Sequence, residues 1–258
     1  SRLRGEFAFA IWDERDGLLF AGRDRFGIKP LYYTIRDGAC HIASEVKAFP
    51  ELGVPLRWDH DTVFDQHRGL MHPPSRSAFD GIHQVPPGCY LITDGASARI
   101  LQYWDIDFPT ADRTGWDRSP HDWVKQLESV LEESVRLRLR ADVPVACYLS
   151  GGLDSCAVLG LASRISSRPL RAYTLSFDHA DYDERSLAEE QAKLSGAEFF
   201  PIDIRSEHMA EHLSDAVYHA ERPIVNAHVV AKYLLSRAVR DSGVKGVLTG
   251  EGSDEVFA

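Results

Sequence analysis

Two short stretches place glycines, hydroxyls and acids directly after apolar segments that have the pattern of buried strands. Residues 143–149 (VPVACYL) lead into residues 150–155 (SGGLDS), and residues 244–248 (VKGVL) lead into residues 249–255 (TGEGSDE). Backbone N–H groups of glycines at the start of a helix bind anions such as phosphate. An acid beside that anion, here Asp154, requires a cation as well, and Mg²⁺ is usually held by one or two carboxylates together with phosphates. The first stretch therefore predicts a site for a magnesium-bound phosphate chain.

A single glycine-serine turn between a strand and a helix is a modest signal, because such turns are common in α/β proteins. The second stretch strengthens the prediction, since ligands of open parallel sheets bind outside the carboxyl ends of the strands. Its three acids, Glu251, Asp254 and Glu255, need a cation or solvent close by. We therefore expect the two loops to face one pocket.

The first loop lacks the lysine of a P-loop, which narrows the nucleotide chemistry expected in this pocket. A P-loop has a lysine after its glycines, whereas Leu153 and Asp154 follow them here. A loop of this kind suits the inner phosphates and a leaving pyrophosphate. An attack by a carboxylate on the α-phosphorus of such a nucleotide gives an acyl-adenylate and pyrophosphate.

The second half of the chain alternates between strand and helix patterns, which predicts a parallel sheet with right-handed crossovers. An apolar stripe at helical spacing runs along residues 121–140. The other helices are expected at 153–165, at 184–196 with Asp183 as the N-cap, at 209–218 and at 227–241, and the other strands at 170–177 and 199–204.

The first half, residues 1–108, is β-rich. Pairs of apolar segments flank turn residues at 14–17, 36–38 and 94–95, which predicts hairpins. Residues 62–70 are expected to form a short helix, and Ser44 to cap a helical turn. Residues 22–31 mix charges with turn formers, and we interpret them as a structural corner.

Four blocks together resemble the glutamine-hydrolysing asparagine synthetase family: residues 22–33 (GRDRFGIKPLYY), 43–49 (ASEVKAF), 150–155 (SGGLDS) and 249–257 (TGEGSDEVF). The resemblance covers essentially the whole chain, and the blocks occur in the order typical of that family. It implies an α+β first part, an Ntn-type antiparallel β sandwich with helices, followed by an α/β parallel-sheet ATP-pyrophosphatase (PP-loop) domain. The expected ranges are 1–108 for a partial class II glutamine amidotransferase domain, 109–120 for a linker and 121–258 for a partial synthetase domain.

The same resemblance implies roles for individual residues. Glu251 matches the residue that acts on the acyl-adenylate step, as the base that takes a proton from ammonia, with a metal-shell or helix-capping carboxylate as the alternative. Asp154 and Asp254 match acids near magnesium. The nucleotide is expected on Leu149, Ser150, Gly151, Gly152, Asp154, Ser155, Leu175, Thr249 and Gly250. The turn 221–223 (ERP) is a weaker candidate for the same pocket.

The chain departs from the family at its first residue. The family's glutaminase uses an N-terminal cysteine whose α-amine serves as base, whereas this chain starts with Ser1 and a stretch that resembles the family's interior. None of Cys40, Cys89, Cys147 and Cys156 has a free α-amine. We therefore expect the sequence to be a fragment, with the nucleophile and the glutamine-binding residues outside it.

Composition fits a cytoplasmic enzyme that acts on small molecules. The chain has 258 residues, of which 44% are hydrophobic, and it contains no signal or membrane-spanning pattern. Its net charge of −10 disfavours a nucleic-acid partner. The spacing of the cysteines favours reduced structural thiols over a metal site or a disulfide framework. The resemblance also allows a homodimer, on which the residues themselves are silent.

The predicted activity is an ATP-dependent amidotransferase that converts aspartate to asparagine through aspartyl-adenylate, with ammonia from glutamine. Two alternatives stay open. A related enzyme would activate a different carboxylate to make an amide or a lactam, and a fragment would bind nucleotide without turnover.

Overall fold

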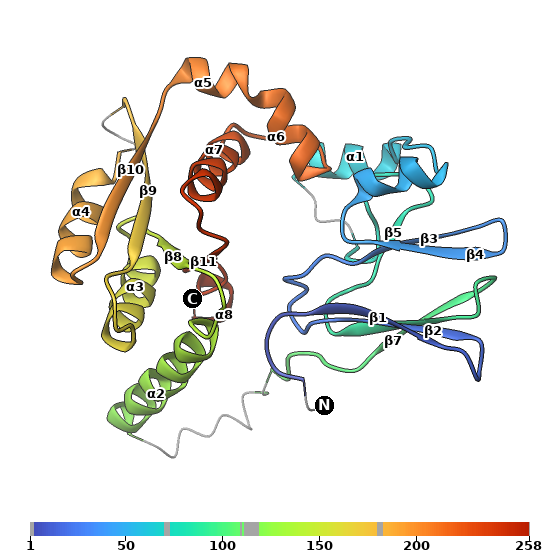
Figure 1. Ribbon diagram of the computed structural model, residues 1–258, viewed down its shortest axis with the longest axis horizontal. Coiled ribbons are helices and arrows are strands. Elements are labelled where there is room, and N and C mark those ends of the chain that lie inside the picture. The colour runs from blue at the N-terminus through green and yellow to red at the C-terminus, as the bar shows by residue number, and fades with distance from the viewer. Residues whose placement is uncertain (1–2, 70–72, 109, 111–118, 180–182, 258) are drawn as a thin grey trace. The chain divides into compact units, whose positions relative to one another are not determined.

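The computed structural model describes residues 3–69, 73–108, 110, 119–179 and 183–257, and the chain divides into two compact units (Figure 1). The first unit comprises Ser1–Asp112 together with Val217–Val225, and the second comprises Arg113–Ala216 together with Asn226–Ala258. The chain thus returns to the first unit for a short stretch between two segments of the second. Most of the predicted linker 109–120 lies outside the described residues, and the three predicted domain ranges stay a prediction.

The second unit is built on a parallel sheet of strand order β10-β9-β8-β11. Its strands are β8 (Val145–Tyr148), β9 (Arg171–Phe177), β10 (Glu198–Ile204) and β11 (Gly246–Leu248). The predicted parallel sheet is therefore confirmed. In the pairing of β11 with β8, Leu248 lies opposite Cys147, so these two strands end at the same level of the sheet. The loops that follow them start side by side.

Helices cover both faces of this sheet, and successive residues of a strand point to opposite faces. Cys147 points into a core with α2 (Pro120–Arg138), α3 (Leu153–Ile165) and α4 (Arg185–Leu194). Its neighbour Ala146 points into a second core, with α7 (His228–Asp241) on the opposite side (Figure 1). Between β10 and α7 the chain forms α5 (Ser206–Glu211) and α6 (Leu213–Ala220), and α8 (Asp254–Phe257) follows β11.

The first unit contains two antiparallel sheets. Strands β1 (Ala8–Asp13), β2 (Leu18–Arg23), β6 (Cys89–Thr93) and β7 (Ala98–Gln102) form one, and β4 (Ala39–Ala43), β3 (Tyr32–Arg36) and β5 (His83–Gln84) form the other. Residues of both sheets, among them Leu91 and Ile42, pack in one cluster. Outside the sheets lie a 3₁₀ helix η1 (Val46–Leu52) and α1 (His60–His67), the latter capped by the Asp59 side chain. The predicted hairpins are confirmed.

Residues 23–29 form a corner in which charged side chains bind backbone groups. The Asp24 carboxylate, 1% exposed, accepts from the N–H groups of Phe7, Phe26, Ile28 and Lys29 at 2.9–3.3 Å. The Arg23 guanidinium donates to the carbonyls of Gly27, Lys29 and Val85, and burial lowers its pKa from the ordinary value. The interpretation of this segment as a structural corner is confirmed.

Three local predictions were wrong. The N-cap of η1 is Glu45 and that of α4 is Glu184, and neither side chain makes a capping hydrogen bond. Ser44 and Asp183 therefore do not cap these helices. The Asp183 carboxylate instead accepts a hydrogen bond from the Phe177 N–H. The helix expected at 209–218 is two helices, because the backbone at His212 leaves the helical region (φ −103°, ψ 11°).

None of the helices in the described part of the chain combines the length and the apolar character that a membrane crossing requires.

Candidate nucleotide-binding pocket

The loop between β8 and α3 is held by its own hydroxyls. The Ser155 hydroxyl accepts from the Ser150 N–H at 3.2 Å and donates to the Gly152 carbonyl at 3.1 Å. The Ser150 hydroxyl lies 3.0 Å from that of Ser155 and accepts from the Gly152 N–H at 3.3 Å. Gly151 has a φ of +82°, which favours glycine, and a Cβ there would lie 3.0 Å from the Leu187 Cβ of α4. The loop is thus preformed, with Gly152 as the N-cap of α3.

The loop after β11 lies directly against the start of α3. A Cβ added at Gly250 would lie 2.8 Å from the Asp154 Cβ and 2.8 Å from the Ser155 nitrogen, so this position admits only glycine without rearrangement. The Ser253 hydroxyl donates to the Gly250 carbonyl at 2.7 Å and closes the turn. The two predicted loops therefore meet, as expected from neighbouring parallel strands.

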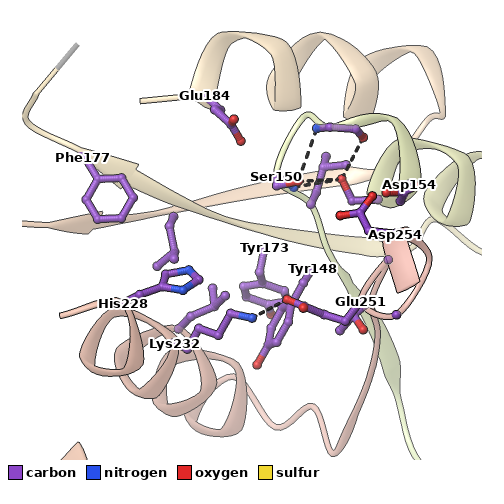
Figure 2. Close-up of a pocket in the computed structure, with 18 of the residues that line it drawn as sticks. Tyr148, Ser150, Asp154, Tyr173, Phe177, Glu184, His228, Lys232, Glu251 and Asp254 are labelled. Atoms are coloured by element: carbon purple, nitrogen blue, oxygen red, sulfur yellow. Dashed lines mark hydrogen bonds and ion pairs between the residues drawn. The ribbon is translucent and has the colours of Figure 1, made fainter. Parts of the chain in front are cut away.

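A cavity of about 380 Å³ opens between these loops and α7 (Figure 2). The structure brings together at this cavity every residue predicted for the site except Gly151, namely Leu149, Ser150, Gly152, Asp154, Ser155, Leu175, Thr249, Gly250, Glu251 and Asp254. Gly151 instead faces α4, where its positive φ shapes the loop. The roles of these residues as nucleotide, metal or catalytic groups remain predictions.

Helix α7 contributes one side of the cavity, which was not predicted from the sequence. His228 and Lys232, one helical turn apart, both line the cavity, and the Lys232 ammonium forms an ion pair with the Glu251 carboxylate (Figure 2). The aromatic rings of Tyr148, Tyr173 and Phe177 also line it. The only sequence signal for α7 was an amphipathic pattern, in which a lysine reads as part of a solvated face. Only the fold brings it to Glu251.

The turn at 221–223 does not line this cavity, contrary to the weaker expectation for it. Glu221 has a positive φ of 53°, and its carboxylate accepts from the N–H groups of Val46 and Lys47, both at 2.7 Å. It also binds the Lys47 ammonium at 3.0 Å. All three residues belong to the first unit, and the Glu221 side chain is 8% exposed. Glu221, two residues before Pro223, thus anchors the returning segment Val217–Val225.

The cavity is strongly acidic. Five carboxylates line it, those of Asp154, Glu184, Glu251, Asp254 and Glu255. Among the described residues no group of three or more histidine, cysteine or acidic side chains is arranged to hold a metal ion by itself. A metal at this site therefore needs further ligands from a bound molecule. Such a division of ligands is usual for Mg²⁺ with phosphates.

The cysteines near the cavity are structural. Cys147 on β8 is 1% exposed, and burial raises the pKa of its thiol to about 12. Burial also raises the pKa of Cys156 on α3. All four cysteines are free thiols in the structure. A neutral, buried thiol is a poor nucleophile, so Cys147 is not a candidate for covalent chemistry, whereas Cys156 is only half-buried.

These features define a class of protein, a parallel-sheet α/β unit with a preformed polar pocket at the strand ends, joined to an antiparallel β unit. A family model for asparagine synthase matches residues 126–258, and one for a glutamine amidotransferase domain matches residues 1–104. The chain belongs to the glutamine-hydrolysing asparagine synthetase family.

Curated relatives match over the full chain. The amidase chyE of Penicillium rubens is 39% identical, and the amidase chry2 of Gibberella zeae is 36% identical, each over 100% of this chain and 40% of its own length. A putative asparagine synthetase [glutamine-hydrolyzing] of Mycobacterium bovis is 34% identical over 99% of this chain and 40% of its own length. The chain thus spans about two fifths of the length of the relatives it matches.

Proposed function

We propose that the complete protein is an ATP-dependent amide-forming ligase that takes its nitrogen from glutamine. The carboxylate of an acid substrate attacks the α-phosphorus of ATP, the bond from that phosphorus to the bridging oxygen breaks, and pyrophosphate leaves. Ammonia then attacks the acyl carbon, AMP leaves, and a proton is released as the amide forms. The observation that carries the proposal is the meeting of the 150–155 and 249–255 loops at one polar cavity.

The described residues supply a place for each part of this reaction. Ser150, Gly152 and Ser155 would cradle the phosphates at the start of α3, where N–H groups and the helix dipole favour anions. Glu251 would accept the proton that ammonia loses. The side chain of Glu251 is 69% exposed on the cavity side, so an incoming nucleophile has access to it.

The acids of the cavity fit a magnesium ion that is shared with the phosphates. Asp154 and Asp254 would hold it, because two carboxylates supply part of the oxygen set that Mg²⁺ takes and phosphates supply more. When bound, the ion offsets the negative charge of the phosphate chain. Without a cation, a nucleotide triphosphate would face five carboxylates.

We take aspartate as the first candidate acid, through aspartyl-adenylate, in line with the family. A second candidate is a different carboxylate. It is favoured by the higher identity of the two relatives named as amidases, 39% and 36%, than of the relative named as an asparagine synthetase, 34%.

The test follows the carboxylate oxygen of the acid into AMP and measures the release of pyrophosphate. The complete protein is incubated with Mg-ATP, an ammonium salt and one acid from a panel of L-aspartate, L-glutamate and aliphatic and aromatic monocarboxylic acids. With the acid labelled by ¹⁸O in its carboxylate, AMP should gain one ¹⁸O, and pyrophosphate and the amide should form in equal amounts. A second run with [¹⁵N-amide]glutamine in place of ammonium should label the amide.

Four outcomes separate the candidates. Labelled AMP with L-aspartate alone supports asparagine formation, and labelled AMP with another acid alone supports the second candidate. Release of ADP and phosphate would contradict the adenylate route. Binding of Mg-ATP without pyrophosphate release for any acid would leave only a nucleotide-binding protein. Glu251→Gln should bind Mg-ATP normally and lose amide formation, with Glu207→Gln on the exposed α5 as control.

A further inference from the structure

Lys232 is the one lysine or arginine among the described residues that line the cavity. It projects from α7 toward the loop after β11, and its ammonium meets the Glu251 carboxylate (Figure 2). No feature of the two glycine loops requires this lysine. Its place opposite α3, across the sheet, also separates it from the loop with the Ser150 and Ser155 hydroxyls.

The described lining of the cavity has many more acidic side chains than basic ones, so its one lysine is a candidate for binding an anionic substrate. Five carboxylates line the cavity, and the proposed reaction brings in one more, that of the acid substrate. A carboxylate that enters an acidic cavity needs a cation to bind to, and magnesium is already assigned to the phosphates. Lys232 is the available protein cation in the described lining.

The ion pair of Lys232 with Glu251 is open to exchange. The Lys232 side chain is 45% exposed and that of Glu251 is 69% exposed, so both ends of the pair face the cavity. A solvent-exposed pair of this kind contributes little to stability. A second carboxylate that arrives at the lysine therefore replaces the first at little cost, and the charge of the lysine stays neutralised throughout.

The walls next to Lys232 suit a carbon skeleton. The half-buried Tyr148 lines the cavity together with Tyr173 and Leu235, which are 2% and 5% exposed. The Tyr148 hydroxyl is 3.0 Å from the Ser236 hydroxyl on α7, which fixes the ring against this helix. An acid with its carboxylate at Lys232 would lay its remaining atoms along this aromatic wall.

We propose that Lys232 binds the reacting carboxylate of the acid substrate in place of Glu251, and that this exchange frees Glu251 to accept a proton from ammonia. The inference rests on the proposed function and extends it to a substrate-specificity residue. In the structure the Glu251 carboxylate occupies the position that the substrate carboxylate takes.

The test compares Lys232→Gln and Lys232→Arg with Lys193→Gln, a control on the exposed face of α4. Each variant of the complete protein is assayed for pyrophosphate release with ammonium, Mg-ATP and the panel acid that supports the wild-type reaction. The KM of the acid and the Kd of Mg-ATP are measured separately. For Lys232→Gln the KM of the acid should rise about fivefold, because a half-exposed ion pair to the substrate carboxylate is lost. The Kd of Mg-ATP should stay within about twofold.

Arginine keeps the positive charge, so Lys232→Arg should recover most of the affinity for the acid, and Lys193→Gln should match the wild type. An unchanged KM in Lys232→Gln with a lower kcat would overturn the inference and leave Lys232 as a support for Glu251. An equal weakening of Mg-ATP binding would also overturn it, because the lysine would then bind phosphate. Loss of pyrophosphate release in the wild type for every acid overturns the proposed function and the inference together.

Discussion

Two regions of this molecule are rich in charged residues, the corner at Asp24 and the cavity at the ends of β8 and β11. They differ in the burial and in the partners of their carboxylates. Asp24 is 1% exposed and accepts from four backbone N–H groups. Glu251 is 69% exposed, and its ion pair is with another half-exposed side chain. Both regions have motif-like sequences, GRDRFG and GEGSDE. A structural motif here binds its charge to backbone groups, whereas a candidate site leaves its charge open to a cavity.

The largest effect is expected from Asp24→Ala, which tests the structural side of the comparison. The change leaves four buried or half-buried N–H groups without their acceptor, so the free energy of unfolding should fall by about 3–5 kcal/mol. Urea denaturation of the complete protein measures it.

The control for that change is Asp94→Ala. Asp94 also accepts backbone N–H bonds, from Ala96 and Ser97, and these hold the pKa of its carboxyl below the ordinary value. Because this loop is exposed, its loss should matter far less than that of Asp24. Equal losses for both variants would show that burial does not set the difference.

The next effect is expected from Gly250→Ala, which tests the functional side. The new Cβ would lie 2.8 Å from the Asp154 Cβ and the Ser155 nitrogen, so the two loops must move apart. The cost in stability should be about 1–3 kcal/mol, while pyrophosphate release should fall about 100-fold because the reacting groups are displaced. The ratio of these effects measures how strictly the cavity depends on the contact.

Gly246→Ala in β11 is the matched control, since a Cβ there would meet the nearest atom, of Val145, at an ordinary 3.7 Å. It should leave both stability and pyrophosphate release close to wild type. A Gly250→Ala variant with wild-type turnover would mean that the contact between the loops is not needed for the reaction.

The last effect concerns the buried thiol of Cys147 and is absent at neutral pH. Burial raises the pKa of its thiol from 9.0 to about 12 in the folded protein. The folded state therefore keeps a proton that the unfolded state loses, and this contribution to stability is complete below pH 9 and is lost between pH 9 and 12. The slope is at most about 1.4 kcal/mol per pH unit.

Cys147→Ala should flatten that part of the pH profile by up to one proton, as measured by urea denaturation between pH 8 and 11. The buried thiol should also resist a thiol reagent in the folded wild-type protein. An identical profile in the variant would show that the thiol ionises equally in both states.

Much of this architecture could be predicted from the sequence, for specific reasons. The runs 143–149 and 244–248 are largely apolar because their strands have helices on both faces, and the glycines after them indicated where the loops meet. Lys232 could not be predicted, since its partner Glu251 is brought to it by the fold. Glu221 was misplaced for the same reason, as its partners Val46 and Lys47 lie far away in the chain. Local caps were also wrong at Ser44 and Asp183, where neighbouring residues took the position.

The return of Val217–Val225 to the first unit has a consequence for any attempt to separate the two halves. A single proteolytic cut between residues 109 and 120 would sever one peptide connection, yet Glu221 would still be covalently attached to α7 through the residues that follow it. A polypeptide ending at residue 108 would lack that carboxylate, and the amides of Val46 and Lys47 would lose their acceptor. The first unit therefore consists of two separate stretches of the chain, and a polypeptide of residues 1–108 omits one of them.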